Sequence, residues 1–232
     1  MVYVTSDLHG YPLEKFLELL KKAEFSDDDY LFILGDVIDR GKDGARILEW
    51  LLYQPNVQLI RGNHETMMLK CDFAFTEITT DSIDALSDEG MRALRHWTRN
   101  GGGETLEGLY KLDKETLKDI VEYLREAPLY ETVKVGDRSF VLTHSGLGNY
   151  RDGKPLPLYS EFDMIWHRPF LEDEYSSEFT TVFGHTPTWH YGDEFRGRMI
   201  KTRTWINIDT GVAFGLHPML LRLDDMKEFY VE

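Results

Sequence analysis

The stretch LFILGDVIDRG, residues 31–41, decides the fold prediction for this chain. Its four apolar residues at 31–34 are typical of a buried strand, and they lead into a turn that carries two aspartates and an arginine between glycines. A solvated turn with an internal Asp-Arg pair is the ordinary explanation, yet no turn needs both glycines and all three charges. The pattern therefore indicates a loop with a chemical task at the end of a strand.

Neighbouring stretches on both sides repeat this arrangement. Towards the N-terminus, a β-rich run at 2–6 leads into Asp7 and His9, which stand two residues apart. Towards the C-terminus, a run at 57–60 leads into Asn63. Taken alone, Asp-x-His is often a helix N-cap beside an exposed imidazole, and Asn63 could be a plain N-cap. Their recurrence at successive strand ends indicates side chains gathered for binding.

Two later runs end in the same way. Residues 140–143 lead to His144, and residues 181–183 lead through Gly184 to His185. Either histidine alone could be a satisfied core residue. Because the carboxyl ends of parallel strands meet at one edge of a sheet, where ligands of α/β proteins bind, the five strand exits together predict a shared site.

Helical patterns lie between the early strands, at 13–23, 43–53 and 65–73. This alternation of strands and helices predicts an α/β fold with parallel strands and right-handed crossovers. The later strands are expected at 206–208 and in two antiparallel pairs, 131–135 with 139–143 and 218–223 with 226–231.

The section from 81 to 125 is rich in helix formers and contains the breaker Gly101-Gly102-Gly103, so we expect a helical insertion there. The hydrophobic content of 42% is enough for a substantial core. No repeat, low-complexity tract or linker divides the chain. Residues 1–232 are therefore expected to form a single domain.

The formal net charge of -15 limits the partners that the chain can attract. An acidic surface repels phosphate backbones and anionic lipids, so neither nucleic acid nor a membrane is expected as a partner. A phosphate could bind only where metal ions or arginines reverse the local field. Cys71 is the one cysteine, so an intrachain disulfide is excluded. The first residues do not resemble a signal peptide, and together with the single cysteine this predicts a cytoplasmic location. The oligomeric state is left open.

The strand-exit motifs resemble those of the calcineurin-like metallophosphoesterases, and more narrowly the PPP-type serine/threonine protein phosphatases in their short bacterial and bacteriophage form. The resemblance runs from Asp7 to about Gly215. It also covers the motifs HW at 96–97, NGGG at 100–103, IWHR at 165–168 and IDTG at 208–211. Ser6 stands where the family usually has glycine, but it is not a ligand. The resemblance implies mixed β-sheets in a sandwich flanked by helices.

The resemblance also implies a binuclear centre of two divalent metal ions. The implied ligands are Asp7, His9 and Asp36 for one ion and Asp36, Asn63, His144 and His185 for the other. Asp36 would bridge the two ions, since a carboxylate has two oxygens to share. Nitrogen and oxygen ligands without sulfur favour Mn²⁺, Fe, Zn²⁺ or Mg²⁺, with Mn²⁺ as the first expectation.

In the same family pattern His64 is the general acid for the leaving group, and Asp39 orients and charges it. The residues implied in phosphate binding are Arg40, Asn63, Arg168 and Arg61. Guanidinium groups suit this task because each can bond two phosphate oxygens. Arg61 has an equally good structural reading, in which it pairs with a nearby carboxylate.

The predicted function is metal-dependent hydrolysis of phosphoserine and phosphothreonine in phosphoproteins or phosphopeptides, by direct attack of a water or hydroxide that the two ions activate. The alternative is a symmetrical diadenosine tetraphosphate hydrolase, or another small-molecule metallophosphoesterase. The tetraphosphate hydrolases usually lack an aspartate at the position of Asp39 and carry aspartate at that of Glu65. A phosphate-binding module without activity is a third reading, which the complete ligand set disfavours.

The remaining histidines, which we expect to be surface or packing residues, are His96, His167, His190 and His217.

Overall fold

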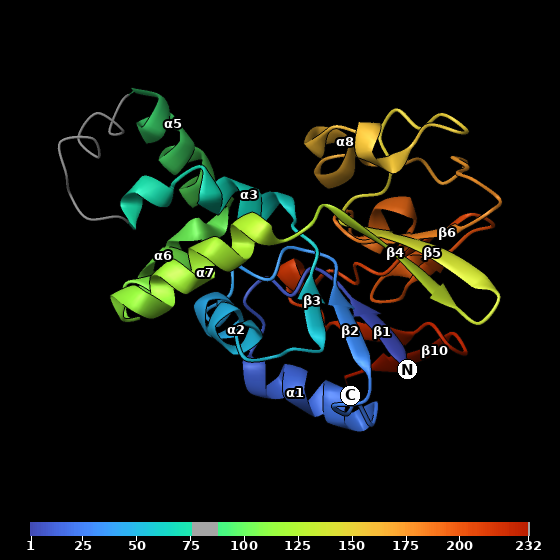
Figure 1. Cartoon of the computed structure of the whole chain (residues 1–232), viewed down its shortest axis with the longest axis horizontal. Coiled ribbons are helices and arrows are strands. Elements are labelled where there is room, and N and C mark those ends of the chain that lie inside the picture. The colour runs from blue at the N-terminus through green and yellow to red at the C-terminus, as the bar shows by residue number, and fades with distance from the viewer. Residues whose placement is uncertain (76–87, 232) are drawn as a thin grey trace.

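The computed structural model describes residues 1–75 and 88–231, whose strands form two five-stranded sheets (Figure 1). The first sheet, in the order β10-β9-β1-β2-β3, contains β1 (Val2–Thr5), β2 (Tyr30–Ile33), β3 (Val57–Leu59), β9 (Met219–Arg222) and β10 (Lys227–Tyr230). The second sheet, in the order β4-β5-β6-β8-β7, contains β4 (Tyr130–Val135), β5 (Arg138–Thr143), β6 (Thr180–Phe183), β7 (Ile200–Lys201) and β8 (Trp205–Asn207).

The central strands of both sheets run parallel. In the first sheet β2 pairs in parallel with β1 and β3, and in the second β6 pairs in parallel with β5 and β8. The expectation of a single sheet edge is wrong, because Asp7, Asp36 and Asn63 follow strands of the first sheet whereas His144 and His185 follow strands of the second. The sandwich that the family resemblance implied is confirmed, and the strand exits meet where the two sheets adjoin.

Strand alternation divides the core into layers, because successive side chains of a strand point to opposite faces. Val4 of β1 and Phe32 of β2 pack between the sheets against Val182 of β6. Their neighbours Tyr3 and Leu31 face the other way, into a cluster built with the helices. Since both faces of the first sheet are apolar, burial fixes its register and therefore the position of each strand exit.

Helices cover the outer faces of the sandwich (Figure 1). The first sheet is covered by α1 (Leu13–Lys22), α2 (Gly44–Leu51), α3 (Asn63–Leu69) and α7 (Lys114–Glu126), and the second sheet by α8 (Glu161–Ile165). None of the helices in the described part of the chain is both long and apolar enough to cross a bilayer.

The predicted insertion at 81–125 is helical over most of its described part, with a turn at 110–113; residues 81–87 lie outside the described residues. Its elements are α5 (Asp88–Trp97), the π-helical turn η2 (Thr98–Gly102), α6 (Gly103–Leu109) and α7. Figure 1 shows α5, α6 and α7 gathered at one side of the molecule. The single-domain organisation of residues 1–232 stays a prediction.

Candidate metal centre and active site

Asp36, at the exit of β2, lies at the centre of a cluster of imidazoles. Its Oδ2 atom is 3.4 Å from His144 Nε2 and 3.8 Å from both His9 Nε2 and His64 Nε2. All of these side chains are at least nine-tenths buried. Residues from both sheets and from the first turn of α3 therefore converge on one carboxylate.

The loops that carry these residues have unusual backbone conformations. The left-handed region, which residues other than glycine seldom adopt, holds Asp7, His9, Asp36, Asp39, Arg40 and His185, with φ between 43° and 71°. Each such residue costs about 1–3 kcal/mol, so the surrounding structure has to hold it in place. Backbone hydrogen bonds between the loops do so: His9 N donates to Asp36 O at 2.8 Å, and Asp7 N donates to Gly35 O at 3.0 Å.

Glu65, which is not among the predicted site residues, joins two of these loops. Its Oε2 accepts hydrogen bonds from Asp36 N and Gly62 N, and its Oε1 accepts one from Val37 N, all at 2.9 Å. Burial and the charge of Asp36 raise the pKa of Glu65 to about 7. The Glu65 side chain therefore holds the β2 and β3 exits together through three backbone N–H groups.

The hydrogen bonds of His144 indicate a ring arranged to hold a cation. Its Nδ1 lies 2.7 Å from the carbonyl oxygen of Leu34, which can only accept, so Nδ1 carries a proton. The other nitrogen, Nε2, faces Asn63 Oδ1 at 2.9 Å and His185 Nδ1 at 3.1 Å, besides Asp36. Acceptors that face one another this closely need a proton or a metal ion between them. A ring held by a backbone carbonyl is the usual arrangement of metal-binding histidines.

His9 repeats this arrangement on the other side of Asp36. Its Nδ1 lies 3.1 Å from the carbonyl oxygen of Ile38, which leaves Nε2 directed towards Asp36 and, at 4.0 Å, towards Asp7 Oδ1. Burial lowers the pKa of His9 to about 3, so the ring is a neutral ligand at neutral pH.

The electrostatics of the cluster also fit cations. Burial raises the pKa of Asp7 to about 6, and burial together with the charge of Asp7 raises the pKa of Asp209 well above its usual range. Burial alone would lower the pKa of His144, but the charge of Asp36 raises it to about 10. A buried group of carboxylates therefore draws in positive charge, which metal ions would supply.

Potential ligand atoms form two groups in the described part of the chain, His9 with Asp36 and His64, and Asp36 with His144 and His185, each within 4.8 Å. Asp36 belongs to both groups, whereas the first contains His64, predicted as the general acid, and not the predicted ligand Asp7, whose Oδ1 lies 4.0 Å from His9 Nε2. The Nε2 atom of His185 is buried and has no hydrogen-bond partner among the described residues. The nitrogen and oxygen donors, this orphaned nitrogen and the facing acceptors of His144 fit a binuclear centre.

Asp39 and His64 form a close pair beside the ligand cluster. His64 Nδ1 lies 2.6 Å from Asp39 Oδ2, and both side chains are buried. Burial opposes protonation of His64, but the charges of Asp36 and Asp39 outweigh it and raise the pKa of the imidazole. Its Nε2 atom faces the cavity, 3.3 Å from Arg40 Nη2. The pair therefore presents an oriented ring nitrogen to any molecule bound there.

A cavity of about 120 Å³ opens over these residues. Arg40 lines it beside His9 and His64, and Arg168 lines it while donating to His185 O at 3.2 Å and Thr186 Oγ1 at 3.1 Å. Arg61 is not among the lining residues. It pairs instead with Glu161 at 3.4 Å, the structural role considered from the sequence.

Several lining residues were not predicted as site residues: Asn100, Trp166, His190, Asp209 and Phe214. His190 in particular was expected at the surface or in packing. The sequence signal for Asn100 was its place before three glycines, and for Asp209 its place after a strand. His190 and Phe214 lie in short 3₁₀ turns and carry no motif of their own.

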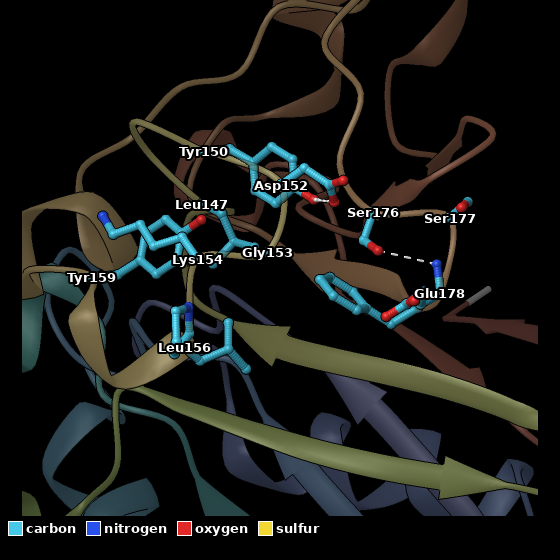
Figure 2. A pocket seen from close by; sticks show the side chains of 12 residues that line it. Leu147, Tyr150, Asp152, Gly153, Lys154, Leu156, Tyr159, Ser176, Ser177 and Glu178 are labelled. Atoms are coloured by element: carbon cyan, nitrogen blue, oxygen red, sulfur yellow. Dashed lines mark hydrogen bonds between the residues drawn. The ribbon is translucent and has the colours of Figure 1, made fainter.

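A larger cavity, of about 400 Å³, lies elsewhere (Figure 2). Figure 2 shows Lys154 beside Tyr159, and the Lys154 Nζ atom lies 3.8 Å from the centre of that ring. None of the predicted metal ligands lines this cavity. Size alone therefore does not identify the functional site; the convergence of ligand atoms does.

Comparison with known proteins bears on the chemistry of this cluster. The sequence profile of the calcineurin-like phosphoesterases matches residues 1–212. Serine/threonine-protein phosphatase 2 of Salmonella typhimurium is 27% identical over 214 residues, which cover 90% of this chain and 87% of that protein. The symmetrical bis(5'-nucleosyl)-tetraphosphatase of Buchnera aphidicola is 39% identical over 69 residues, which cover 29% of this chain and only 25% of that protein. A crystal structure of a candidate diadenosine tetraphosphatase has a TM-score of 0.67 at 19% identity and covers 99% of this chain and 92% of the other, a likeness of fold alone.

Proposed function

Because the chain belongs to the calcineurin-like phosphoesterase family, it is a metallophosphoesterase hydrolase, and we propose that it removes phosphate from phosphoserine and phosphothreonine in proteins. Its partner would be a phosphoprotein or phosphopeptide, its preferred cation would be Mn²⁺, and its location would be the cytoplasm. The Salmonella phosphatase supports it, since that similarity extends over most of both chains.

The observation that carries the proposal is the contact between Asp39 Oδ2 and His64 Nδ1 at 2.6 Å. Hydrolysis of a phosphoserine releases an alkoxide, a poor leaving group that needs a proton as its bond to phosphorus breaks. An imidazole oriented and charged by a buried carboxylate can supply that proton from Nε2. A phosphoanhydride has a much better leaving group and depends less on such an acid.

The predicted ligands Asp7, His9, Asp36, Asn63, His144 and His185 would hold two divalent cations. When bound, these cations supply positive charge for the phosphoryl oxygens and lower the pKa of a water molecule. Around them, Arg40 and Arg168 would bind the phosphoryl group through their guanidinium forks. His64 would hold the proton for the leaving oxygen, and Asp39 would keep its ring in position.

Hydrolysis of symmetrical dinucleoside tetraphosphates is the second candidate. It is favoured by the local identity to the Buchnera enzyme, over a stretch that is short relative to both chains. Asp39 and Glu65 count against it, because that family usually has neither residue at these positions. In this chain both are buried and fully engaged, Asp39 with His64 and Glu65 with three backbone N–H groups.

The test compares turnover of phosphoserine and phosphothreonine peptides with turnover of diadenosine tetraphosphate, using the Mn²⁺-loaded protein. We expect the peptides to be preferred and Asp39→Asn to lower kcat on them by at least about 10-fold. Asp113→Asn is a matched control, since Asp113 caps α7 and asparagine caps a helix equally well.

Two results would overturn the proposal. Turnover of the dinucleotide alone would establish the second candidate. No turnover of para-nitrophenyl phosphate with added Mn²⁺ would favour the binding module without activity.

A further inference from the structure

Two residues of the helical insertion reach the carboxylate of Asp39. Trp97, the last residue of α5, donates its indole Nε1–H to Asp39 Oδ2 at 2.9 Å. Thr105, in α6, donates its hydroxyl to Asp39 Oδ1 at 2.7 Å and accepts a hydrogen bond from Asp39 N at 2.8 Å. All three residues are at most 1% exposed. Both oxygens of the carboxylate, and its own backbone N–H, are therefore engaged by the insertion.

The insertion also contacts the next residue of the β2 exit loop. Arg40 N donates to Gly101 O at 3.0 Å. Gly101 has a φ of 104°, and a Cβ atom there would lie 2.6 Å from Arg40 Cγ and 2.9 Å from Arg40 N. The backbone of η2 therefore lies directly against the residue predicted to bind phosphate.

Ordinary packing explains part of this arrangement, because buried polar groups find partners in almost every protein. Packing does not require Trp97 and His64 to use the same oxygen. Asp39 Oδ2 accepts from Trp97 Nε1 at 2.9 Å and faces His64 Nδ1 at 2.6 Å, while Thr105 holds Oδ1. These contacts fix the rotation of the Asp39 carboxylate, and the carboxylate in turn fixes the orientation of the His64 imidazole.

We propose that Trp97 and Thr105 are positioning residues for catalysis, which hold Asp39 so that His64 Nε2 is directed at the leaving oxygen of the substrate. The inference rests on the proposed phosphomonoesterase function. In that reaction the water oxygen bonds to phosphorus, and the bond to the leaving oxygen breaks with its electron pair on that oxygen. The His64 proton completes the alcohol, while the water keeps one proton as a hydroxyl of the phosphate product and releases the other to solvent. The helical insertion thereby becomes part of the catalytic machinery.

The test uses Trp97→Phe, which keeps an aromatic ring but removes the donor, and Thr105→Val, which keeps the shape but removes the hydroxyl. Each variant is assayed with Mn²⁺ on a phosphoserine peptide and on para-nitrophenyl phosphate, whose leaving group needs no proton. We expect kcat on the peptide to fall about 10- to 100-fold and kcat on the nitrophenyl ester to change by less than about 3-fold. Thr105→Ser, which restores a hydroxyl, should recover most of the peptide activity.

Two controls separate positioning from general stability. Trp50→Phe changes a tryptophan of α2 that packs on Phe16 away from the cavity, and it should leave both activities unchanged. In a His64→Asn background, Trp97→Phe and Thr105→Val should cause no further loss, because residues that act through one another are not additive.

Equal losses on both substrates, or additive losses in the His64→Asn background, would overturn the inference. If Trp97→Phe does not fold, the ratio of peptide to nitrophenyl-ester activity in Thr105→Val alone tests the positioning role. Failure of the proposed function itself looks different: the unmodified protein would not hydrolyse the phosphoserine peptide at all.

Discussion

Replacing Gly184 by alanine tests how tightly the metal centre is packed. Gly184 connects β6 to His185 and donates its N–H to His144 O at 2.8 Å. A Cβ atom at this position would overlap Asp7 Oδ2 and Ser6 Oγ and would lie 2.8 Å from Ser6 Cβ. The new methyl group therefore strikes the carboxylate of a predicted ligand and the residue before it.

The size of the effect follows from these contacts. Ordinary van der Waals contact begins near 3.4 Å, so Ser6 Cβ would have to move by roughly 0.6 Å, and Asp7 Oδ2 by more. Ser6 Cβ is attached directly to the backbone, so it cannot rotate away. Overpacking of this kind costs about 1–3 kcal/mol, which lowers Tm by roughly 2–12 °C in a chain of this size. Displacement of Asp7 should weaken metal binding by about 10- to 100-fold, as loss of a positioning contact does.

The assay measures Tm in the presence of EDTA and the Mn²⁺ concentration that gives half-maximal hydrolysis of para-nitrophenyl phosphate. Gly103→Ala is the matched control. Gly103 has helical φ and ψ at the start of α6, and a Cβ atom there meets nothing within 4 Å. That control should keep its metal dependence and gain about 0.4–1 kcal/mol of stability. If Gly184→Ala kept the Tm and the Mn²⁺ dependence of Gly103→Ala, the packing argument for Asp7 would be refuted.

Three further experiments test the bridging role of Asp36, the general-acid role of His64 and the burial of Cys71. Asp36→Asn should weaken binding of both metal ions by at least about 10- to 100-fold, and two equivalents of tightly bound metal in this variant, by elemental analysis, would contradict the bridge. His64→Asn should lower turnover of a phosphoserine peptide by about 10²- to 10⁴-fold without loss of metal; an unchanged rate would remove the general-acid role. Burial raises the pKa of the Cys71 thiol to about 11, so at pH 8 iodoacetamide should label the folded protein at least about 100-fold more slowly than the urea-unfolded chain. Equal labelling rates would contradict the raised pKa. Because the folded-state pKa is the higher one, the thiol does not weaken the fold below about pH 9, and the folded state loses stability as pH rises from there towards 11 and the unfolded chain ionises first.

The strands and their exits could be predicted because their signals are local. An apolar run that ends in glycine and charged residues, as at 31–41, indicates both a buried strand and a loop with ligands. The predicted strand at 57–60 corresponds to β3, which ends at Leu59, and the predicted helix at 13–23 corresponds to α1. The helix predicted at 65–73 begins earlier, at Asn63, because Glu65 completes its first turn by accepting from Gly62 N.

Contacts between distant residues could not be predicted in this way. Trp97 and Thr105 meet Asp39 across separations of 58 and 66 residues, and no periodicity in the sequence couples them. Arg61 stands in a ligand motif, yet it pairs with Glu161, a partner 100 residues away. Its motif could not reveal which way the side chain turns.

From the sequence, apolar runs and glycine-flanked turns predicted that Asp, Asn and His residues follow successive strands, because these signals act over only a few residues. The assignment of these residues as metal ligands came from the family resemblance. Other features required the tertiary structure: the candidate ligands come from two sheets, His144 directs its Nε2 atom towards Asn63 and Asp36, and the insertion contacts Asp39. These features depend on burial. A desolvated carboxylate or imidazole takes its position and its charge from whatever neighbours the packing of the whole chain provides.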